Sequence, residues 1–179
     1  GGGGPNTLVV FTSDGNIRLG DAITTGGIQF EGNDTSGANV SSKTLDDYEE
    51  GVYTTTLTDS LGGTLSVASS NNQMQYVKIG NMVFVSGRPL VGTTGGTGYV
   101  RIGLPFTNAG LPQASARAAG SVDLRLCNSS YDIGLFNIQM NGGSNYCTLV
   151  YGDSNDSVPS TPAMEVSTQI WVSIFYRTI

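Results

Sequence analysis

Short blocks of Val, Ile, Thr, Tyr and Phe recur along this chain, and each block ends at Gly, Asn, Asp or Ser. The blocks follow one another at intervals of about 8 to 12 residues, and none has the apolar spacing of an amphipathic helix. The clearest pair is MQYVKI and MVFVS, at residues 74–79 and 82–86, joined by Gly80-Asn81, a turn pair suited to a tight hairpin. About eight to ten such strands predict an all-β fold, an antiparallel β-sandwich or jelly roll.

The charged residues exclude several classes of function. The net charge is −6, and the 8 Lys and Arg residues are scattered singly, so no basic stripe is available for phosphate groups. Histidine is absent, which removes the commonest general base and a usual zinc ligand. The Ser and Thr residues lack an activating partner, and no apolar run approaches the ~18 residues of a membrane span. We expect a protein that is not an enzyme, has no catalytic residues or cofactor, binds no nucleic acid and does not insert into a membrane.

The two cysteines, Cys127 and Cys147, lie in separate apolar runs without a CxxC motif. This arrangement gives no support for a metal site or a redox centre. Free buried thiols are the favoured interpretation. A disulfide stays open as the alternative, because neighbouring strands could bring the two Cα atoms within roughly 7 Å.

The N-terminal part of the chain contains few large apolar side chains. After an opening GGGGP come short strand-like segments, which turn at Asp14-Gly15 and break at Gly26-Gly27, and then a polar linker. Such strands bury too little surface to form a core alone, so identical neighbours should stabilise them. The pattern predicts a glycine-rich β stalk and linker at residues 1–43, an acidic collar at 44–54 and a globular β head at 55–179.

Four carboxylates surround Tyr48 in the acidic collar: Asp46, Asp47, Glu49 and Glu50. A glycosidase would need two carboxyl groups that flank a sugar at ~5 to 10 Å, which adjacent residues in a polar junction rarely achieve. Clustered oxygens also suit calcium, so the four residues are a candidate metal site. The favoured interpretation is structural, with the carboxylates accepting hydrogen bonds from backbone N–H groups where the stalk becomes the head.

The C-terminal stretch QIWVSIFYRTI, at residues 169–179, has the pattern of a strand with two apolar faces. One face carries Ile170, Val172, Ile174 and Tyr176, and the other carries Trp171, Phe175 and Arg177. A strand covered on both sides is either central in a sandwich or packed against another subunit. We favour the subunit contact, because the N-terminal strands already require neighbours.

Three further segments stand out: LDDYEEG at residues 45–51, YVKIGNMVFVSG at 76–87 and RIGLPFTNAG at 101–110. Together they resemble the C-terminal region of tail-fibre proteins from tailed bacteriophages, over most of the chain after about Gly26. The resemblance implies an intertwined homotrimer, in which a β stalk ends in a receptor-binding head. It also implies a virion component that is assembled in the host cytoplasm and joined to other tail proteins through its N-terminal side. One departure is Val52-Tyr53, where the family has Thr, then Trp or Phe, and then Pro.

Exposed loops on a rigid β scaffold are where recognition residues usually lie. The candidate loops span residues 92–99, 128–132, 141–146 and 152–160. Aromatic faces and the side chains of Asn, Asp and Arg hold sugars, and the candidates of this kind are Tyr131, Asp132, Asn145, Tyr146, Asp153 and Asn155. We predict that these residues bind a host surface polysaccharide or an outer-membrane protein. Three copies on one trimer could strengthen such a shallow site by ~10² or more.

Two other functions are compatible with the same sequence. The first is a structural virion component, such as a capsid decoration or head fibre, with the same trimeric fold and no dedicated receptor site. The second is an accessory domain of a depolymerase whose catalytic part lies upstream. Adsorption of virions that lack the protein distinguishes the first from a receptor-binding tip, and release of reducing ends from capsule would reveal the second.

Overall fold

The computed structural model describes residues 9–11, 17–19, 28–29, 44–45, 48–95, 98–110, 118–126, 135–152 and 164–179. The chain divides into two compact units, Gly1–Tyr48 and Glu49–Ile179. The division falls inside the segment that we predicted as an acidic collar. Glu49 to Thr54 therefore belong to the same unit as the predicted head.

The described residues of the first unit form two short antiparallel pairs of strands. β1 (Val9–Phe11) pairs with β2 (Ile17–Leu19), and β3 (Ile28–Gln29) pairs with β4 (Thr44–Leu45). Phe11 is opposite Ile17, whereas a two-residue turn at Asp14-Gly15 would place Phe11 opposite Arg18. The residues that join the two strands, 12–16, lie outside the described residues.

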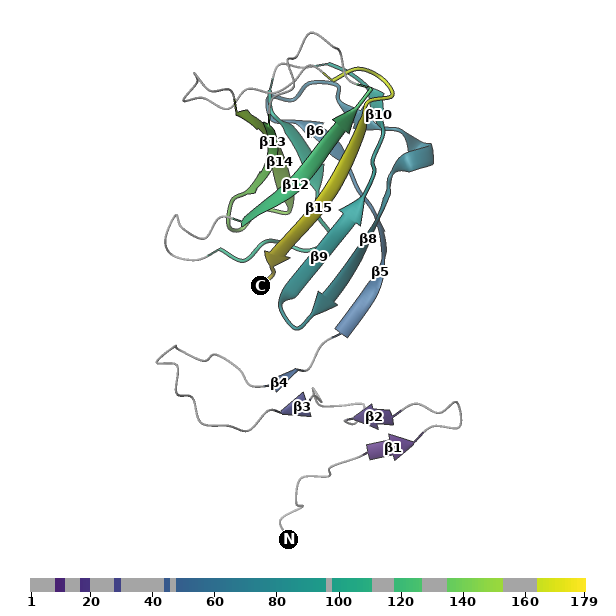
Figure 1. Ribbon diagram of the computed structural model, residues 1–179, viewed down its shortest axis with the longest axis vertical. Helices are drawn as coiled ribbons and strands as arrows, with labels where there is room; N and C mark the ends of the chain where they lie inside the picture. The colour runs from purple at the N-terminus through teal and green to yellow at the C-terminus, as the bar shows by residue number, and fades with distance from the viewer. Residues whose placement is uncertain are drawn as a thin grey trace. The chain divides into compact units, whose positions relative to one another are not determined.

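The second unit is built around one antiparallel sheet of nine strands, in the order β5-β8-β9-β15-β12-β13-β14-β11-β6 (Figure 1). Its strands are β5 (Tyr48–Thr54), β6 (Leu57–Asp59), β8 (Gln73–Ile79), β9 (Met82–Gly87), β11 (Val100–Gly103), β12 (Ala118–Arg125), β13 (Leu135–Met140), β14 (Tyr146–Gly152) and β15 (Gln169–Arg177). β7 (Ser66–Val67) and β10 (Val91–Thr93) form a separate pair. The described residues include one 3-10 turn, η1 (Ser69–Asn71), and no α-helix, so the predicted all-β antiparallel fold is confirmed.

The nine-stranded sheet curls so that both of its edges belong to one segment of chain. β5 and β6 form the two edges, and only Thr55 and Thr56 separate them in the sequence. At this point the backbone changes partners: the Thr55 N–H donates to the carbonyl of Asn72 at 2.7 Å, and the Gly103 N–H donates to the carbonyl of Thr56 at 2.9 Å. The segment thus links the two ends of the sheet and encloses an apolar interior.

The interior is filled by the inward rows of the strands. The buried apolar side chains are Leu57, Leu65, Met74, Val83, Val85, Val91, Val100, Ile102, Leu104, Ile138, Met140, Cys147, Leu149, Val150, Ile170, Val172, Ile174 and Tyr176. Full burial of one such side chain stabilises a fold by roughly 1.5–3 kcal/mol, so this set supplies most of the driving force for folding. Cys147 is a free thiol in this core, and burial raises its pKa to about 12. Cys127 lies outside the described residues.

Several strand predictions agree with the structure. β8 and β9 form the expected hairpin, with Ile79 opposite Met82 and Gly80 at a φ of 55°. The C-terminal strand alternates as expected, with one row buried and the other exposed. The alternation of SVDLRL, residues 121–126, predicts a strand on which Val122, Leu124 and Leu126 share one face and Asp123 and Arg125 lie on the wet face. In β12, Val122 and Leu124 are half-buried, and Asp123 and Arg125 are exposed.

Two local predictions need correction. The alternation of VYTTTL predicts that the first strand of the head covers residues 52–57. Instead β5 begins at Tyr48 and ends at Thr54, so Glu49 and Glu50 lie on a strand. We also expected Leu126 to continue the inward row of β12. Instead its φ is 61° and its side chain is 66% exposed, because the chain turns out of the strand at this residue. The jelly-roll arrangement, the trimer and the stalk stay predictions.

Candidate functional site

The structure describes two of the six residues that we predicted to bind a receptor. Tyr131, Asp132, Asp153 and Asn155 lie outside the described residues. Asn145 is exposed, and its carbonyl accepts a hydrogen bond from the Leu104 N–H at 2.9 Å. Tyr146 begins β14 and is half-buried, with the guanidinium of Arg101 4.4 Å from the centre of its ring. The two residues lie together, but one face of the Tyr146 ring is occupied by Arg101.

In the described part of the acidic collar, Glu49 contacts Tyr76 on the neighbouring strand β8. The Tyr76 hydroxyl donates a hydrogen bond to the Glu49 carboxylate. Burial has the largest effect on the pKa of Tyr76 and the Glu49 carboxylate the next, and both raise this pKa above its usual value. A Cβ on Gly51 would lie 3.3 Å from the Tyr76 ring, so the glycine lets the ring pack against the backbone of β5. Asp46 and Asp47 lie outside the described residues, and the calcium site stays a prediction.

The three segments that carry the family resemblance meet around Tyr76. The ring of Tyr53, just after LDDYEEG, lies 6.3 Å from the ring of Tyr76 in YVKIG, in an edge-to-face arrangement. The ring of Phe106, in RIGLPFTNAG, lies 5.3 Å from the ring of Tyr76, also in an edge-to-face arrangement. The Tyr176 hydroxyl donates to the carbonyl of Phe106 at 3.0 Å and secures the LPF segment to β15. Tyr53, Tyr76 and Phe106 therefore form a cluster that packs against the buried core.

A wide groove lies over the outer faces of four neighbouring strands and beside η1. It has a volume of about 950 Å³ and crosses β8, β9, β15 and β12, which lie side by side in Figure 1. The residues that line it are Ser69, Ser70, Asn71, Asn72, Gln73, Met74, Gln75, Ser86, Gly87, Arg88, Ser121, Val122, Asp123, Trp171, Val172 and Ser173. We call it the Trp171 groove, after the one tryptophan of the chain.

Trp171 lies between charged side chains of both neighbouring strands. The guanidinium of Arg88, just after β9, is 5.4 Å from the centre of its ring, and that of Arg125 on β12 is 5.2 Å from it. Asp123 is directly opposite Trp171 in the β12–β15 register and accepts a 2.9 Å hydrogen bond from Arg125. Trp171 nevertheless stays 43% exposed, so part of its surface is available to a ligand.

Neutral polar side chains continue across the groove next to Trp171. Gln75, Ser86, Ser173 and Ser121 stand opposite one another on β8, β9, β15 and β12, and form a row across the four strands. Hydroxyl and amide groups can both donate and accept hydrogen bonds. An aromatic ring, a guanidinium and such neutral groups on one surface can bind a polyhydroxylated ligand.

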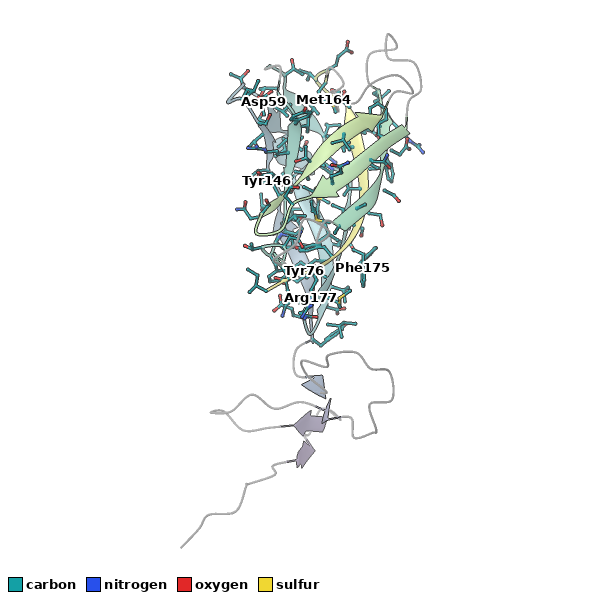
Figure 2. The ribbon with its side chains drawn as sticks, turned by 90° about the vertical axis from the view of Figure 1, so that its left-hand side faces the viewer. Asp59, Tyr76, Tyr146, Met164, Phe175 and Arg177 are labelled. Carbon is teal, nitrogen blue, oxygen red and sulfur yellow. The ribbon has the colours of Figure 1, made fainter. Side chains whose placement is uncertain are left out.

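An apolar patch lies on the same outer surface, on the other side of this polar row. Its members are Val52, Ile79, Met82, Phe84 and Phe175, which are 36% to 61% exposed. Phe175 lies opposite Phe84 and Ile79 opposite Met82, so the patch continues across β8, β9 and β15. Figure 2 shows Phe175 and Arg177 toward one end of the head and Asp59 at the other. Exposed apolar side chains gathered in this way are typical of protein interfaces.

Fold and surface together define an antiparallel all-β protein with an open groove of mixed aromatic, polar and charged character. No protein-family model matches the chain, and a search of curated proteins finds no similar sequence. Within the described residues, no helix is long and apolar enough to cross a membrane.

Sequence reasoning missed the residues of the Trp171 groove. It placed Trp171 on the face opposite the buried row of the last strand, which is correct, but it did not identify the groove. The subunit contact expected for this face stays a prediction. The useful signal was a single tryptophan at the start of the strand, before Ser173 interrupts the apolar row. Arg88 and Asp123 are far from Trp171 in the sequence, and only strand pairing brings them beside it.

Proposed function

We propose that this chain is a non-enzymatic receptor-binding protein, the tip of a bacteriophage tail fibre, which attaches the virion to a glycan on the host surface. The observation that supports the proposal is the Trp171 groove. Trp171 offers an apolar ring surface, and Gln75, Ser86, Ser121 and Ser173 offer hydrogen-bonding groups around it. The resemblance of the motif segments to tail-fibre proteins agrees with this function. An outer-membrane protein receptor is the alternative target.

The same proposal includes an intertwined homotrimer with a β stalk and a jelly-roll head. Two features support the assembly. The apolar patch leaves Phe84 and Phe175 41% and 55% exposed to solvent in a single chain, and a neighbouring copy would remove them from water. The strands of the first unit are two or three residues long, too short to be stable in isolation. Three weak sites on one particle would then act together.

The test of glycan attachment is binding of the purified protein to host cells before and after the surface polysaccharide is removed. Replacement of Trp171 by Ala should weaken binding at least about tenfold, because ~1.4 kcal/mol of lost contact corresponds to that factor. Tyr48→Ala is the control, since it removes another exposed aromatic ring that lies outside the groove. If binding is unchanged after the polysaccharide is removed and is also unchanged in the Trp171→Ala variant, the glycan proposal is wrong.

A structural virion component is the second candidate, and one observation favours it. Arg88 and Arg125 both pack against Trp171, which is also how an aromatic ring is held in a purely structural role. If virions without this protein adsorb to host cells as well as complete virions do, the structural function is correct. Release of reducing ends from purified capsule by a longer chain would instead assign it to a depolymerase.

A further inference from the structure

We infer that the Trp171 groove binds a sugar that carries a carboxylate group, and that Arg88 is the residue that takes this carboxylate. The inference rests on the function proposed above and specifies the class of glycan. It is carried by the pairing of charges in the groove, by the way the backbone holds Arg88, and by the neutral groups next to it.

The charges in the groove leave one cation without a carboxylate partner. Asp123 is paired with Arg125 through a 2.9 Å contact between the carboxylate and Nε, so these two charges offset each other. Among the described residues, none provides a carboxylate in an ion pair with Arg88. Arg88, Arg125 and Asp123 together leave one positive charge around Trp171, on a chain whose net charge is −6. A planar guanidinium matches the geometry of a carboxylate and can bind it through two hydrogen bonds.

The backbone on both sides of Arg88 is held in place. Gly87 is opposite Met74 on β8 and Val172 on β15, and a Cβ at Gly87 would lie only 2.6 Å from the Met74 side chain. On the other side, the carbonyl of Pro89 accepts a hydrogen bond from the Ile170 N–H at 3.0 Å. The guanidinium itself lies over the Trp171 ring. Because Arg88 is already ordered, less conformational entropy is lost when an anion binds.

The groups next to Arg88 suit the rest of a sugar. Ser86 and Ser173 are directly opposite each other, and both line the groove together with Asn72. Their hydroxyl and amide groups can exchange hydrogen bonds with sugar hydroxyls and carry no charge that would repel a carboxylate. The exposed part of Trp171 can pack against the apolar face of the same sugar ring.

The experiment uses matched pairs of polysaccharides immobilised as probes. Each pair consists of a uronic-acid polymer, a sialylated glycan or the host surface polysaccharide, and the same material with its carboxyl groups reduced to alcohols. The protein should bind at least one acidic member about tenfold more tightly than its reduced form, and the difference in affinity should shrink as the salt concentration rises. A phosphorylated glycan without carboxylates is included as a separate arm.

Two variants test whether the preference for the acidic polysaccharide depends on Arg88. Arg88→Gln should remove the preference for the acidic member, so that the acidic and reduced forms bind with equal affinity. Arg101→Gln is the matched control, because Arg101 also packs over an aromatic ring but lies outside the groove. It should keep the preference. The melting temperatures of both variants show whether the fold is intact.

The outcomes separate the inference from the function on which it rests. Equal binding of acidic and reduced forms, or an acidic preference that survives Arg88→Gln, contradicts the carboxylate inference while glycan attachment stands. Preference for the phosphorylated glycan alone also contradicts it. If no polysaccharide binds and host-cell attachment does not depend on the surface polysaccharide, the inference and the proposed glycan receptor are both wrong.

Discussion

At several positions in the head, close contacts restrict which side chain fits, and the linear sequence does not reveal these contacts. A Cβ at Gly87 would lie only 2.6 Å from the Met74 side chain, and a Cβ at Gly51 would make a tight contact of 3.3 Å with the Tyr76 ring. Neither glycine has a positive φ, so backbone conformation does not explain them. Tyr53 shows the same dependence on its surroundings: its hydroxyl donates to the carbonyl of Gly103 at 3.1 Å, and burial raises its pKa well above the usual value.

At the residue scale, Gly87→Ala should destabilise the head. The added Cβ would lie 2.6 Å from Cγ, 3.0 Å from Cβ and 3.2 Å from Cα of Met74, so β8 and β9 would have to separate. Overpacking of this kind costs about 1–3 kcal/mol in the free energy of unfolding, measured by denaturant titration. Gly110→Ala is the control, since its nearest neighbour would lie at 3.5 Å. Equal unfolding midpoints for the two variants would contradict the prediction.

The strands were more predictable than the loops, for a physical reason. The alternation in β15 and the Gly80-Asn81 hairpin depend on residues close in sequence, so local pattern was enough to identify them. The start of β5 was not predicted, because its acidic residues are poor strand formers in isolation. Pairing with β8 and the contact between Glu49 and Tyr76 place them on a strand all the same.

At the element scale, Asp59 joins two loops and makes stability depend on pH. Its carboxylate accepts a hydrogen bond from the Leu61 N–H at 2.6 Å and another from the Gly98 N–H at 2.9 Å. These hydrogen bonds lower the pKa of Asp59 below 3.8. The one from the Leu61 N–H has the largest effect, and the other backbone N–H groups add to it. Because the folded pKa is lower than the unfolded one, the stabilisation is present above pH 3.8 and is lost as pH falls through the folded pKa.

Asp59→Asn should therefore be less stable than the wild type near neutral pH, and the difference should narrow as pH falls below 3.8. Thermal unfolding of both proteins between neutral pH and about pH 2 measures it. Asp123→Asn serves as the control, because Asp123 is an exposed residue paired with a side chain instead of with loop backbone. A constant gap between wild type and Asp59→Asn over the whole range would contradict the prediction.

For the whole molecule, the outer surface of the sheet has two distinct halves. The polar row of Gln75, Ser86, Ser173 and Ser121 separates the Trp171 groove from the apolar patch. Under the proposed function, the apolar patch would contact another copy while the groove stays open to a ligand. Assembly and binding are then separable by mutation.

At this scale, Phe175→Asp should abolish the trimer without unfolding the single chain. The side chain is 55% exposed, so the change does not place a charge in the core, but it does place one in the proposed interface. Light scattering at micromolar concentration should give the mass of three chains for the wild type and of one chain for the variant. Val166→Asp is the control, because Val166 is 59% exposed and lies outside the apolar patch. A wild-type mass near that of one chain would overturn the trimer.

The sequence alone determined the all-β class, the central hairpin and the alternation of the last strand, because these depend on neighbours within a few residues. It also indicated that the outer face of the last strand is apolar. Only the tertiary structure decided that the edges of the sheet are joined through Thr55 and Thr56, and that Arg88 and Asp123 lie beside Trp171. These contacts depend on the strand order, which pairs segments far apart in the chain and which no local pattern of side chains encodes.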